Sequence, residues 1–485
     1  MKRLFYTLLF FLPCMLIACG GSDDTPDGDN NPPVVAPPSE EPVDSRLLYN
    51  GIRLPEQWPP VRSSSSELEK GMSPFYLSDK PSVINISVGR QLFVDNFLIE
   101  STNLKRTFYY PEYYSGNPIL TPEQDWEKTG TKGAAFAAPF SDGVWYDEKE
   151  GKYKMWYMAG GGSYATSGAG VTCYAESTDG IHWTKPTLPV VAGTNIVDYN
   201  SERDASVIWL DKQESNASKR YKMFLVARES GKWRYHYKTS PDGKVWRAAV
   251  QSEPIADRST VYKNPFRNVW VYSMRHNVRV DANKLVRARD YNENADPEAG
   301  TKKAEALLSA FWFGPWANEQ HHTDYPNIAP AIYNQDATPY ESIMLGFFSV
   351  WQGPENDVCA SDNVIKRNQV MVGYSRDGYS WFREDMNPFH AVNTTTSDAW
   401  NQGNLQSVAG APLIVGDKLY FYLSGRRLRG TQEITTTGLA MLRRDGFASM
   451  KGTGELQTSL LKFDGSYFFV NANVAGEMKV ELLDS

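Results

Sequence analysis

A seven-residue box, Ser-x-Asp-Gly-x-x-Trp, occurs three times in this chain of 485 residues and constrains its fold more than any other feature. The copies begin at Ser177, Ser240 and Ser375, and a degenerate copy, Arg-Asp-Gly-Phe, begins at Arg444. From one copy to the next, the aspartates are 63, 135 and 68 residues apart, so the middle gap spans about two periods. Internal repeats of this length predict stacked or radial units. The pattern favours a β-propeller, whose ligands bind at the mouth of the central channel.

The box itself has the composition of a turn. Glycine supplies the positive φ of a tight turn, and aspartate accepts backbone N–H groups there. The tryptophan is large enough to fill the wedge between neighbouring units. We therefore expect the box aspartates to be structural and not catalytic.

Five aromatic-rich segments echo one another between the boxes. They are Tyr153–Met158, Tyr221–Val226, Val269–Tyr272, Ile343–Phe347 and Leu419–Tyr422. Such runs, bounded by Gly, Asn and Asp, are typical of strands. Five echoes predict an all-β fold: a five-bladed β-propeller with four-stranded antiparallel blades over residues 84–450. The C-terminal segment, 451–485, reads as a short β extension that either closes the ring or begins an accessory domain.

The N-terminus has the pattern of an export signal. Two basic residues precede an apolar run that ends at Ala18, and Leu16-Ile17-Ala18-Cys19 resembles a lipobox. The run is too short to be a good transmembrane span. We expect a signal over 1–18, a solvated Pro-rich tether over 19–45 and an irregular segment over 46–83. The prediction is a bacterial outer membrane lipoprotein, anchored through Cys19 and facing the periplasm or the cell surface; an ordinary signal or an uncleaved anchor is the alternative.

Composition excludes several classes of function. The net charge is −7 with no basic block, which argues against a nucleic acid partner. The six histidines show no zinc-ligand spacing, and the body cysteines, Cys173 and Cys359, lie in different units, so we expect free, packed thiols. No nucleophilic serine elbow or phosphate loop is present. We expect a monomer with no metal and no cofactor.

An acidic residue stands shortly before the first strand of successive units. These candidate catalytic residues are Asp142, Asp204, Asp257 and Asp324. First strands line the channel of a propeller, so equivalent positions on different blades converge. Clustered carboxylates push their pKa values apart, and one protonated and one ionised carboxyl flanking a bond is what glycoside hydrolysis requires. The alternative for each single aspartate is a turn in which it caps backbone N–H groups.

Two of these acids stand in segments that resemble family motifs. Arg203-Asp204, followed by an apolar strand, resembles the Arg-Asp-Pro motif of invertase-like enzymes, with Ala205 in place of proline. The segment Asp142–Tyr146 resembles the first-blade segment that carries their nucleophile or base. The chain thus resembles the five-bladed propeller glycoside hydrolases, the group of invertase-like, arabinanase-like and mannoside-phosphorylase-like enzymes. The resemblance implies that Asp204 stabilises the transition state and that Asp257 stands nearest to the third-blade acid.

Other residues are suited to binding a sugar. Arginine donates bidentate hydrogen bonds to hydroxyls or a uronate, histidine moves protons, and tryptophan stacks on sugar rings. The candidates are Arg203, Arg275, His322, Trp312, Trp351 and Trp400. The alternatives are salt bridges for the arginines and interior packing for the tryptophans.

The leading hypothesis is an exported, lipid-anchored glycoside hydrolase. It cleaves glycosidic bonds in plant or algal oligo- or polysaccharide fragments through a carboxylate acid/base pair at the propeller axis. One alternative is a sialidase-like six-bladed enzyme with three arginines and a Tyr–Glu nucleophile pair. The other is a non-catalytic surface glycan-binding propeller, which needs no acids. Replacing Asp204 and Asp324 separates a binder from an enzyme.

Overall fold

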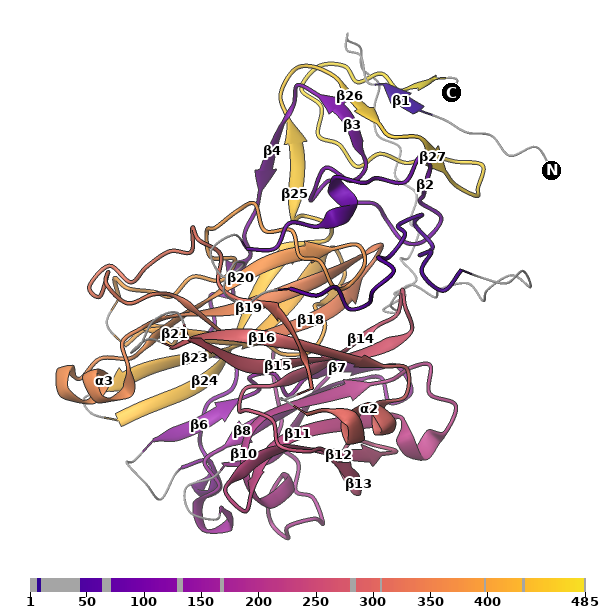
Figure 1. The fold of residues 1–485 in the computed structure, drawn as a ribbon. Helices are drawn as coiled ribbons and strands as arrows, with labels where there is room; N and C mark the ends of the chain where they lie inside the picture. The colour runs from indigo at the N-terminus through magenta and orange to yellow at the C-terminus, as the bar shows by residue number, and fades with distance from the viewer. Residues whose placement is uncertain are drawn as a thin grey trace.

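Strands dominate the computed structural model (Figure 1). The model describes residues 7–9, 44–62, 71–128, 134–165, 170–279, 285–305, 308–396, 398–429 and 432–483. Its two α-helices in these ranges are short, α2 (Pro297–Lys303) and α3 (Asn356–Asp362), and no helix there is long and apolar enough to cross a membrane. The predicted all-β class is confirmed.

The large body consists of consecutive groups of antiparallel strands. In the first group, β6 and β7 both pair with β8, which pairs with β9. The second group is the meander β10–β11–β12–β13, and the third is the separate four-stranded sheet β14–β15–β16–β17. The bounds are Ala135–Ala138, Val144–Asp147, Lys152–Ala159 and Gly170–Ser177 for β6 to β9; Ile196–Leu210, Tyr221–Glu229, Lys232–Ser240 and Arg247–Gln251 for β10 to β13; and Thr260–Asn264, Val269–Arg279, Leu285–Asn294 and Ala310–Phe313 for β14 to β17.

Two further groups complete the body. In the fourth, β18 pairs with β19 and β19 with β20. In the fifth, β21 and β22 pair with β23, which pairs with β24. The bounds are Ala331–Tyr340, Ile343–Gly353 and Arg367–Ser375 for β18 to β20, and Asn404–Val408, Leu413–Val415, Lys418–Arg429 and Gln432–Arg443 for β21 to β24. The five aromatic segments lie in β8, β11, β15, β19 and β23, so their prediction as strands is confirmed.

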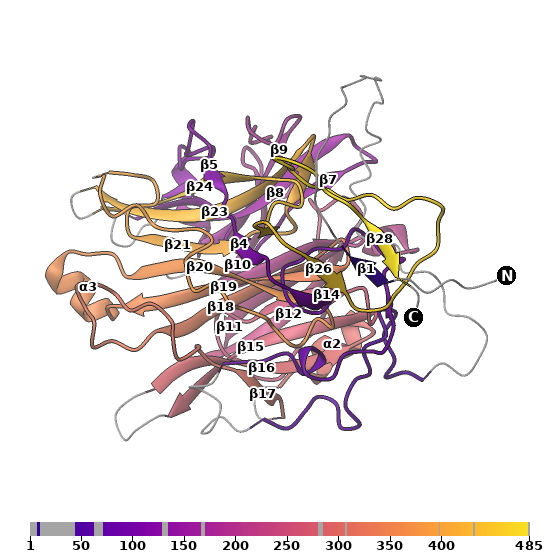
Figure 2. The same cartoon turned by 90° about the horizontal axis from the view of Figure 1, so that it is seen from above.

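The fifth group of strands pairs with the segment just before the first group and with the first strand of that group. The short strand β5 (Glu112–Tyr113) pairs antiparallel with β24, and β6 pairs with β24 in parallel. Seen from above, β24, β23, β21, β20, β19 and β18 follow one another side by side, with α3 beyond one end of them (Figure 2). The last group is therefore joined to β5, before the repeats, and to β6, the first strand of the first group.

A smaller group of strands lies beside the body, at the top of Figure 1. Residues 84–108 supply one strand of each of three pairs, and residues 448–462 supply the other. The pairs are β2 (Ile84–Asn85) with β27 (Leu461–Lys462), β3 (Ile99–Thr102) with β26 (Leu456–Thr458), and β4 (Lys105–Phe108) with β25 (Ala448–Lys451). A buried ion pair between Asp95 and Arg376, with contacts of 2.8–3.1 Å, fixes this group to the fourth group of strands.

The predicted signal falls mostly outside the described residues, and so does Cys19. Within it, β1 (Thr7–Leu9) pairs with β28 (Glu481–Leu483). The 3-10 helices are η1 (Phe75–Leu77), η2 (Asp125–Glu127), η3 (Gly162–Tyr164) and η4 (Ala217–Lys219). Cys173 and Cys359 are free thiols, as predicted.

The boxes are turns that fasten one group of strands to the next. In the second copy, the Ser240 hydroxyl accepts from the Gly243 N–H at 2.9 Å, and Asp242 accepts from the Lys244 N–H at 2.8 Å. Each box glycine has φ near +75° and offers its carbonyl to an aromatic side chain of a neighbouring group. The donors and acceptors are Tyr422 to Gly180, Trp156 to Gly243 and Tyr262 to Gly378.

One expected detail of the box is corrected. Trp381 is fully buried, but Trp183 and Trp246 are only partly buried. The seams at the first two boxes are filled by the aromatic side chain that reaches across to the glycine carbonyl. The structural role of the box thus depends on its glycine as much as on its tryptophan.

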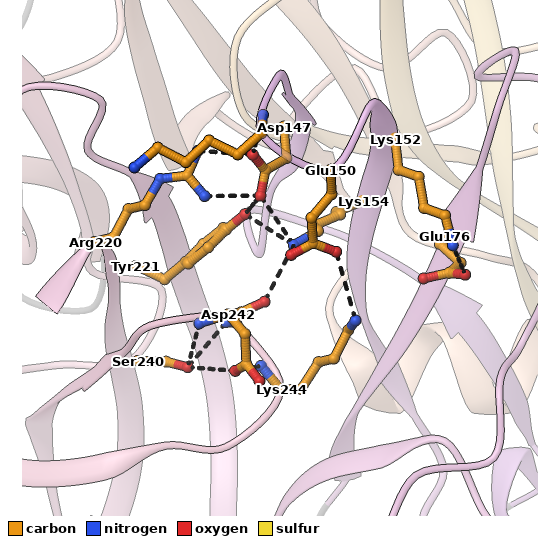
Figure 3. A network of polar contacts seen from close by, with 12 residues as sticks. Asp147, Glu150, Lys152, Lys154, Glu176, Arg220, Tyr221, Ser240, Asp242 and Lys244 are labelled. Carbon is orange, nitrogen blue, oxygen red and sulfur yellow. Dashed lines mark hydrogen bonds and ion pairs between the residues drawn. The ribbon is translucent and has the colours of Figure 1, made fainter. Parts of the chain in front are cut away.

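A closed polar network lies on the seam between the first and second groups (Figure 3). Asp147 and Lys154 are fully buried and lie 3.0 Å apart. Asp147 also accepts two hydrogen bonds from Arg220, at 2.7 and 2.8 Å, and one from the Tyr221 hydroxyl. Lys154 in addition contacts Glu150 at 2.6 Å. Arg220, Tyr221 and Lys154 hold the pKa of Asp147 far below its usual range, against the effect of burial. Every charge of this seam has an opposite charge beside it.

Candidate active site

A polar cavity of about 120 Å³ lies where the third and fourth groups of strands meet. Arg275 on β15 and Arg287 on β16 face it from adjacent strands, and Asp257 and Arg258 reach it from the turn before β14. Tyr333 and Trp351 come from β18 and β19, Glu355 and Asn356 from the start of α3, and Lys366 from just before β20. The cavity therefore lies near the α3 end of the strands in Figures 1 and 2.

Three carboxylates are held around this cavity, each by an arginine that lines it. Asp204 accepts from the Arg258 guanidinium at 2.9 Å and from its backbone N–H at 2.8 Å. Asp257 pairs with Arg275, and Glu355 lies 3.8 Å from Arg287. The exposed fractions of the three acid side chains rise in the order Asp204, 14%, Asp257, 30%, and Glu355, 58%. Of the predicted candidates, Asp257 lines the cavity and Asp204 pairs with Arg258 of its lining; Glu355 lines the cavity as well.

Cations surround one phenol in the cavity. The charged groups of Arg258, Arg287 and Lys366 lie 5.4–5.8 Å from the centre of the Tyr333 ring. The Lys366 ammonium is 3.5 Å from the Tyr333 hydroxyl. Although burial raises the pKa of Tyr333, Arg258 and Lys366 lower it overall to about 8. The phenol is therefore poised to release its proton near neutral pH, next to groups that stabilise the phenolate.

One predicted tryptophan lines the cavity. Trp351 is 5% exposed, and the Arg287 guanidinium lies 4.9 Å from its ring centre. Trp312 is fully buried and donates its indole N–H to the Tyr379 carbonyl at 3.0 Å. Trp400 lies in the interior against glycines of β23 and β24. Trp312 and Trp400 therefore serve as interior packing in this structure, the alternative that the sequence left open.

Asp142 and Arg203 form a buried pair outside the cavity lining. The Arg203 guanidinium donates to both oxygens of Asp142, at 2.6 and 3.1 Å, and Asp142 has no exposed surface. Burial raises the pKa of Asp142, whereas the paired Arg203 opposes the rise. Because Arg203 directly precedes Asp204, the pair fixes the stretch of β10 that carries Asp204. The contacts give Asp142 and Arg203 a positioning role in the site.

Asp324 and His322 stand apart from the cavity lining. Asp324 is exposed, and its backbone N–H donates to the buried His322 ring at 3.0 Å. Burial and the nearby Arg367 lower the pKa of His322. Of the four predicted aspartates, Asp257 lines the cavity, Asp204 pairs with the lining Arg258 and Asp142 pairs with Arg203; their convergence as a catalytic set stays a prediction.

Several residues of the cavity were not predicted from the sequence. They are Arg258, Arg287, Tyr333, Glu355 and Lys366. Arg258 directly follows the predicted Asp257, and Glu355 closely follows the predicted Trp351. Their closeness in sequence to predicted residues is a signal that could have identified both. Arg287 and Lys366 belong to no repeat or motif. Within the described ranges, no group of three or more His, Cys, Asp or Glu side chains is arranged to hold a metal ion.

No family model matches the chain, and no curated protein matches it significantly. Solved structures are similar to it at low sequence identity. One named "Glycoside hydrolase" has 12% identity and a TM-score of 0.42, covering 70% of this chain and 92% of its own. A fructofuranosidase from Schwanniomyces occidentalis in complex with fructose has 12% identity and a TM-score of 0.41, covering 69% and 58%. An N-acetylgalactosamine deacetylase from F. plautii has 10% identity and a TM-score of 0.40, covering 67% and 96%. The solved structures to which this chain is similar thus include glycoside hydrolases, the class predicted from its motifs.

Proposed function

We propose that this protein is a glycoside hydrolase whose active site is the cavity between the third and fourth groups of strands. One observation supports this above all: Asp257 and Glu355, each beside an arginine, line a single polar cavity with an aromatic wall, and Asp204 pairs with Arg258 of the same lining. Carboxylates accept hydrogen bonds from sugar hydroxyls, and a pair of them supplies the proton transfer and the charge stabilisation that glycosidic cleavage needs.

The surroundings of the three acids suggest different roles. Glu355 is the most exposed and is only loosely paired, so it is the best placed to protonate a leaving oxygen. Asp257, opposite on the third group, acts as base or nucleophile. Asp204 is fixed by two donors from Arg258 and stabilises positive charge on the sugar ring. Whether Asp142 and Asp324 contribute to the chemistry stays a prediction, and the experiment below tests it for Asp324.

The wider setting is part of the same proposal. The five groups of antiparallel strands and their link through β5 support a five-bladed propeller. The lipobox-like sequence ending at Cys19 supports export and lipid anchoring at the outer membrane. The proposed substrate is a polysaccharide fragment. A Cys19→Ser variant that remained membrane-associated in unchanged amount would contradict the lipid anchor.

The sialidase-like alternative is tested by the position of Tyr333. Three arginines, Tyr333 and Glu355 do share the cavity. However, the hydrogen bond of the Tyr333 hydroxyl is to the Lys366 ammonium, and no carboxylate of the described residues lies within hydrogen-bonding distance of it. A nucleophilic tyrosine needs a neighbouring base to take its proton. The contacts therefore favour the carboxylate pair.

The experiment is a hydrolysis screen of the purified protein against a panel of plant and algal oligosaccharides. Asp204→Asn, Asp257→Asn and Asp324→Asn are then compared on the best substrate, with circular dichroism to confirm folding. We expect the first two to lose most of the activity; the third tests the prediction for Asp324. Glycan binding without turnover in the wild-type protein would identify a binding protein. Full activity in both Asp204→Asn and Asp257→Asn would refute the site.

A further inference from the structure

The cavity holds more positive than negative charge. Its cations are Arg258, Arg275, Arg287 and Lys366, and the carboxylates paired with them are Asp204, Asp257 and Glu355. The protein as a whole has a net charge of −7, so this local excess runs against the composition of the chain.

The three acids pair with the arginines of the cavity, and none of them pairs with Lys366. Its ammonium contacts the Asn356 side-chain oxygen at 3.2 Å and the Tyr333 hydroxyl at 3.5 Å. Among the residues that the structure describes, no carboxylate lies within 4 Å of it. An ammonium that lines a cavity beside neutral partners is free to take an anionic oxygen from a ligand.

Arg275 and Arg287 reinforce the same side of the cavity. The Arg275 Nε–H is buried and has no hydrogen-bond partner in the described part of the chain. Burial and the neighbouring Arg287 lower the pKa of Arg275, which indicates that the two guanidinium groups repel each other. In the described part of the chain, the carboxylate beside Arg287 is that of Glu355, at 3.8 Å, beyond hydrogen-bonding distance. A bound anion would relieve this repulsion, give the Arg275 Nε–H an acceptor and give Arg287 an acceptor within hydrogen-bonding distance.

We propose that the substrate is an acidic glycan, whose carboxylate or sulfate group binds among Lys366, Arg287 and Arg275. This inference rests on the proposed function and narrows its substrate class. The acidic group would lie beside these cations, with the glycosidic bond toward Glu355 and Asp257. Carboxylate and sulfate offer the same anionic oxygens to these cations, so the experiment must distinguish them.

Matched pairs of ligands test the inference directly. Oligogalacturonates and alginate oligosaccharides are each compared with their carboxyl-reduced forms, and sulfated galactan oligosaccharides with their desulfated forms. Binding is measured by calorimetry at low salt, and turnover is measured on the same ligands. We expect at least one acidic ligand to bind about ten-fold or more tightly than its neutral counterpart, the effect of one charge-assisted hydrogen bond. The pair that shows the preference identifies carboxylate or sulfate.

Variants assign the preference to the cavity. Lys366→Gln and Arg287→Gln should each remove most of the preference for the acidic ligand, whereas Lys366→Arg should retain it. Lys451→Gln, at an exposed lysine of β25 in the smaller strand group, is the control and should change nothing. Equal or no binding of acidic and neutral ligands, or a preference that survives both Gln variants, would overturn the inference. Hydrolysis of neutral glycans alone would overturn it and leave the hydrolase intact, whereas charge-selective binding without turnover would support it and refute the hydrolase.

Discussion

The seam around Asp147 and the cavity around Tyr333 are built from the same residue types with opposite results. At the seam, Arg220 and Lys154 meet a fully buried carboxylate, and Tyr221 donates to it, so burial and the acid raise the pKa of this phenol far above its usual range. At the cavity, cations meet Tyr333 and lower its pKa to about 8. The seam is closed and its charges are balanced. The cavity is open and has an excess of positive charge. The difference teaches that pairing, and not composition, separates a structural network from a site.

The largest expected difference between the seam and the cavity is in catalysis, when an acid of the cavity is replaced. Asp257→Asn should lower kcat by about 10²–10⁴-fold, the usual contribution of an acid/base or nucleophilic group, because the amide cannot carry the charge. The melting temperature should change little, since this side chain is 30% exposed. Asp357→Asn, at an exposed acid on α3, is the matched control and should keep full activity. A comparable loss in both variants would remove the distinction between the cavity and the surface.

The seam should respond in the opposite way. Asp147→Asn leaves Lys154 and Arg220 without their shared carboxylate, and removing one partner of a buried ion pair costs about 3–5 kcal/mol. Urea denaturation measures the loss in the free energy of unfolding. The folded fraction should retain its kcat, because the seam lies outside the cavity. A stable but inactive Asp147→Asn protein would show that the two regions are not separate in function.

Another buried carboxylate, that of Asp336, lacks the cationic partner that Asp147 has. It accepts from the Asn334 amide at 3.1 Å and the Val408 N–H at 3.2 Å, and no cation of the described residues lies within 4 Å. Burial raises its pKa to about 6, from 3.8. The folded protein therefore binds this proton more tightly, and the resulting stability is present below pH 4 and is lost as the pH rises to about 6.

This loss amounts to at most about 3 kcal/mol, since one pKa unit corresponds to about 1.4 kcal/mol. Other acids titrate in the same range, so the informative quantity is the difference between wild type and Asp336→Asn. Unfolding curves from pH 4 to 7 should show Asp336→Asn gaining stability relative to wild type as the pH rises. Parallel pH profiles for the two proteins would contradict a raised pKa at Asp336.

The smallest effect concerns the packing of a box turn at the seam. Gly243 and Gly231 have similar φ, +77° and +79°, but a Cβ on Gly243 would lie 2.3 Å from the Trp156 ring, whereas one on Gly231 would meet nothing within 4 Å. Gly231→Ala should cost about 1–2 kcal/mol for the left-handed backbone alone. Gly243→Ala should cost more in the same denaturation assay, because Trp156 must also move. Equal costs would mean that the box does not fasten the seam.

The sequence was sufficient to predict the all-β class and the five aromatic strands. The five aromatic segments are strands because their residues are apolar on both sides and are bounded by turn formers, a pattern that needs no tertiary information. The pairing of β5 with β24 was not predictable, since Glu112–Tyr113 carries no repeat signal and its partner lies more than 300 residues away. The same holds for the pairing of residues 84–108 with the C-terminal segment.

The sequence pointed to acids expected shortly before the first strands. That rule named Asp257, which does precede β14, and Asp204, which the structure places within β10. It could not separate them from Asp142, which is fully buried and paired with Arg203. Lys366, Arg287 and Tyr333 come from different strands with no shared motif, and only the folded chain brings them to one cavity.

The most direct test of the central claim is the dependence of the Glu355→Gln variant on the leaving group. A proton donor is needed for a sugar leaving group and hardly at all for a dinitrophenolate, which departs without protonation. Relative to wild type, Glu355→Gln should lose about 10²–10⁴-fold in kcat/KM on the natural oligosaccharide and less than about ten-fold on the matching dinitrophenyl glycoside. Equal losses on both substrates, or no loss on the oligosaccharide, would contradict acid catalysis from this cavity.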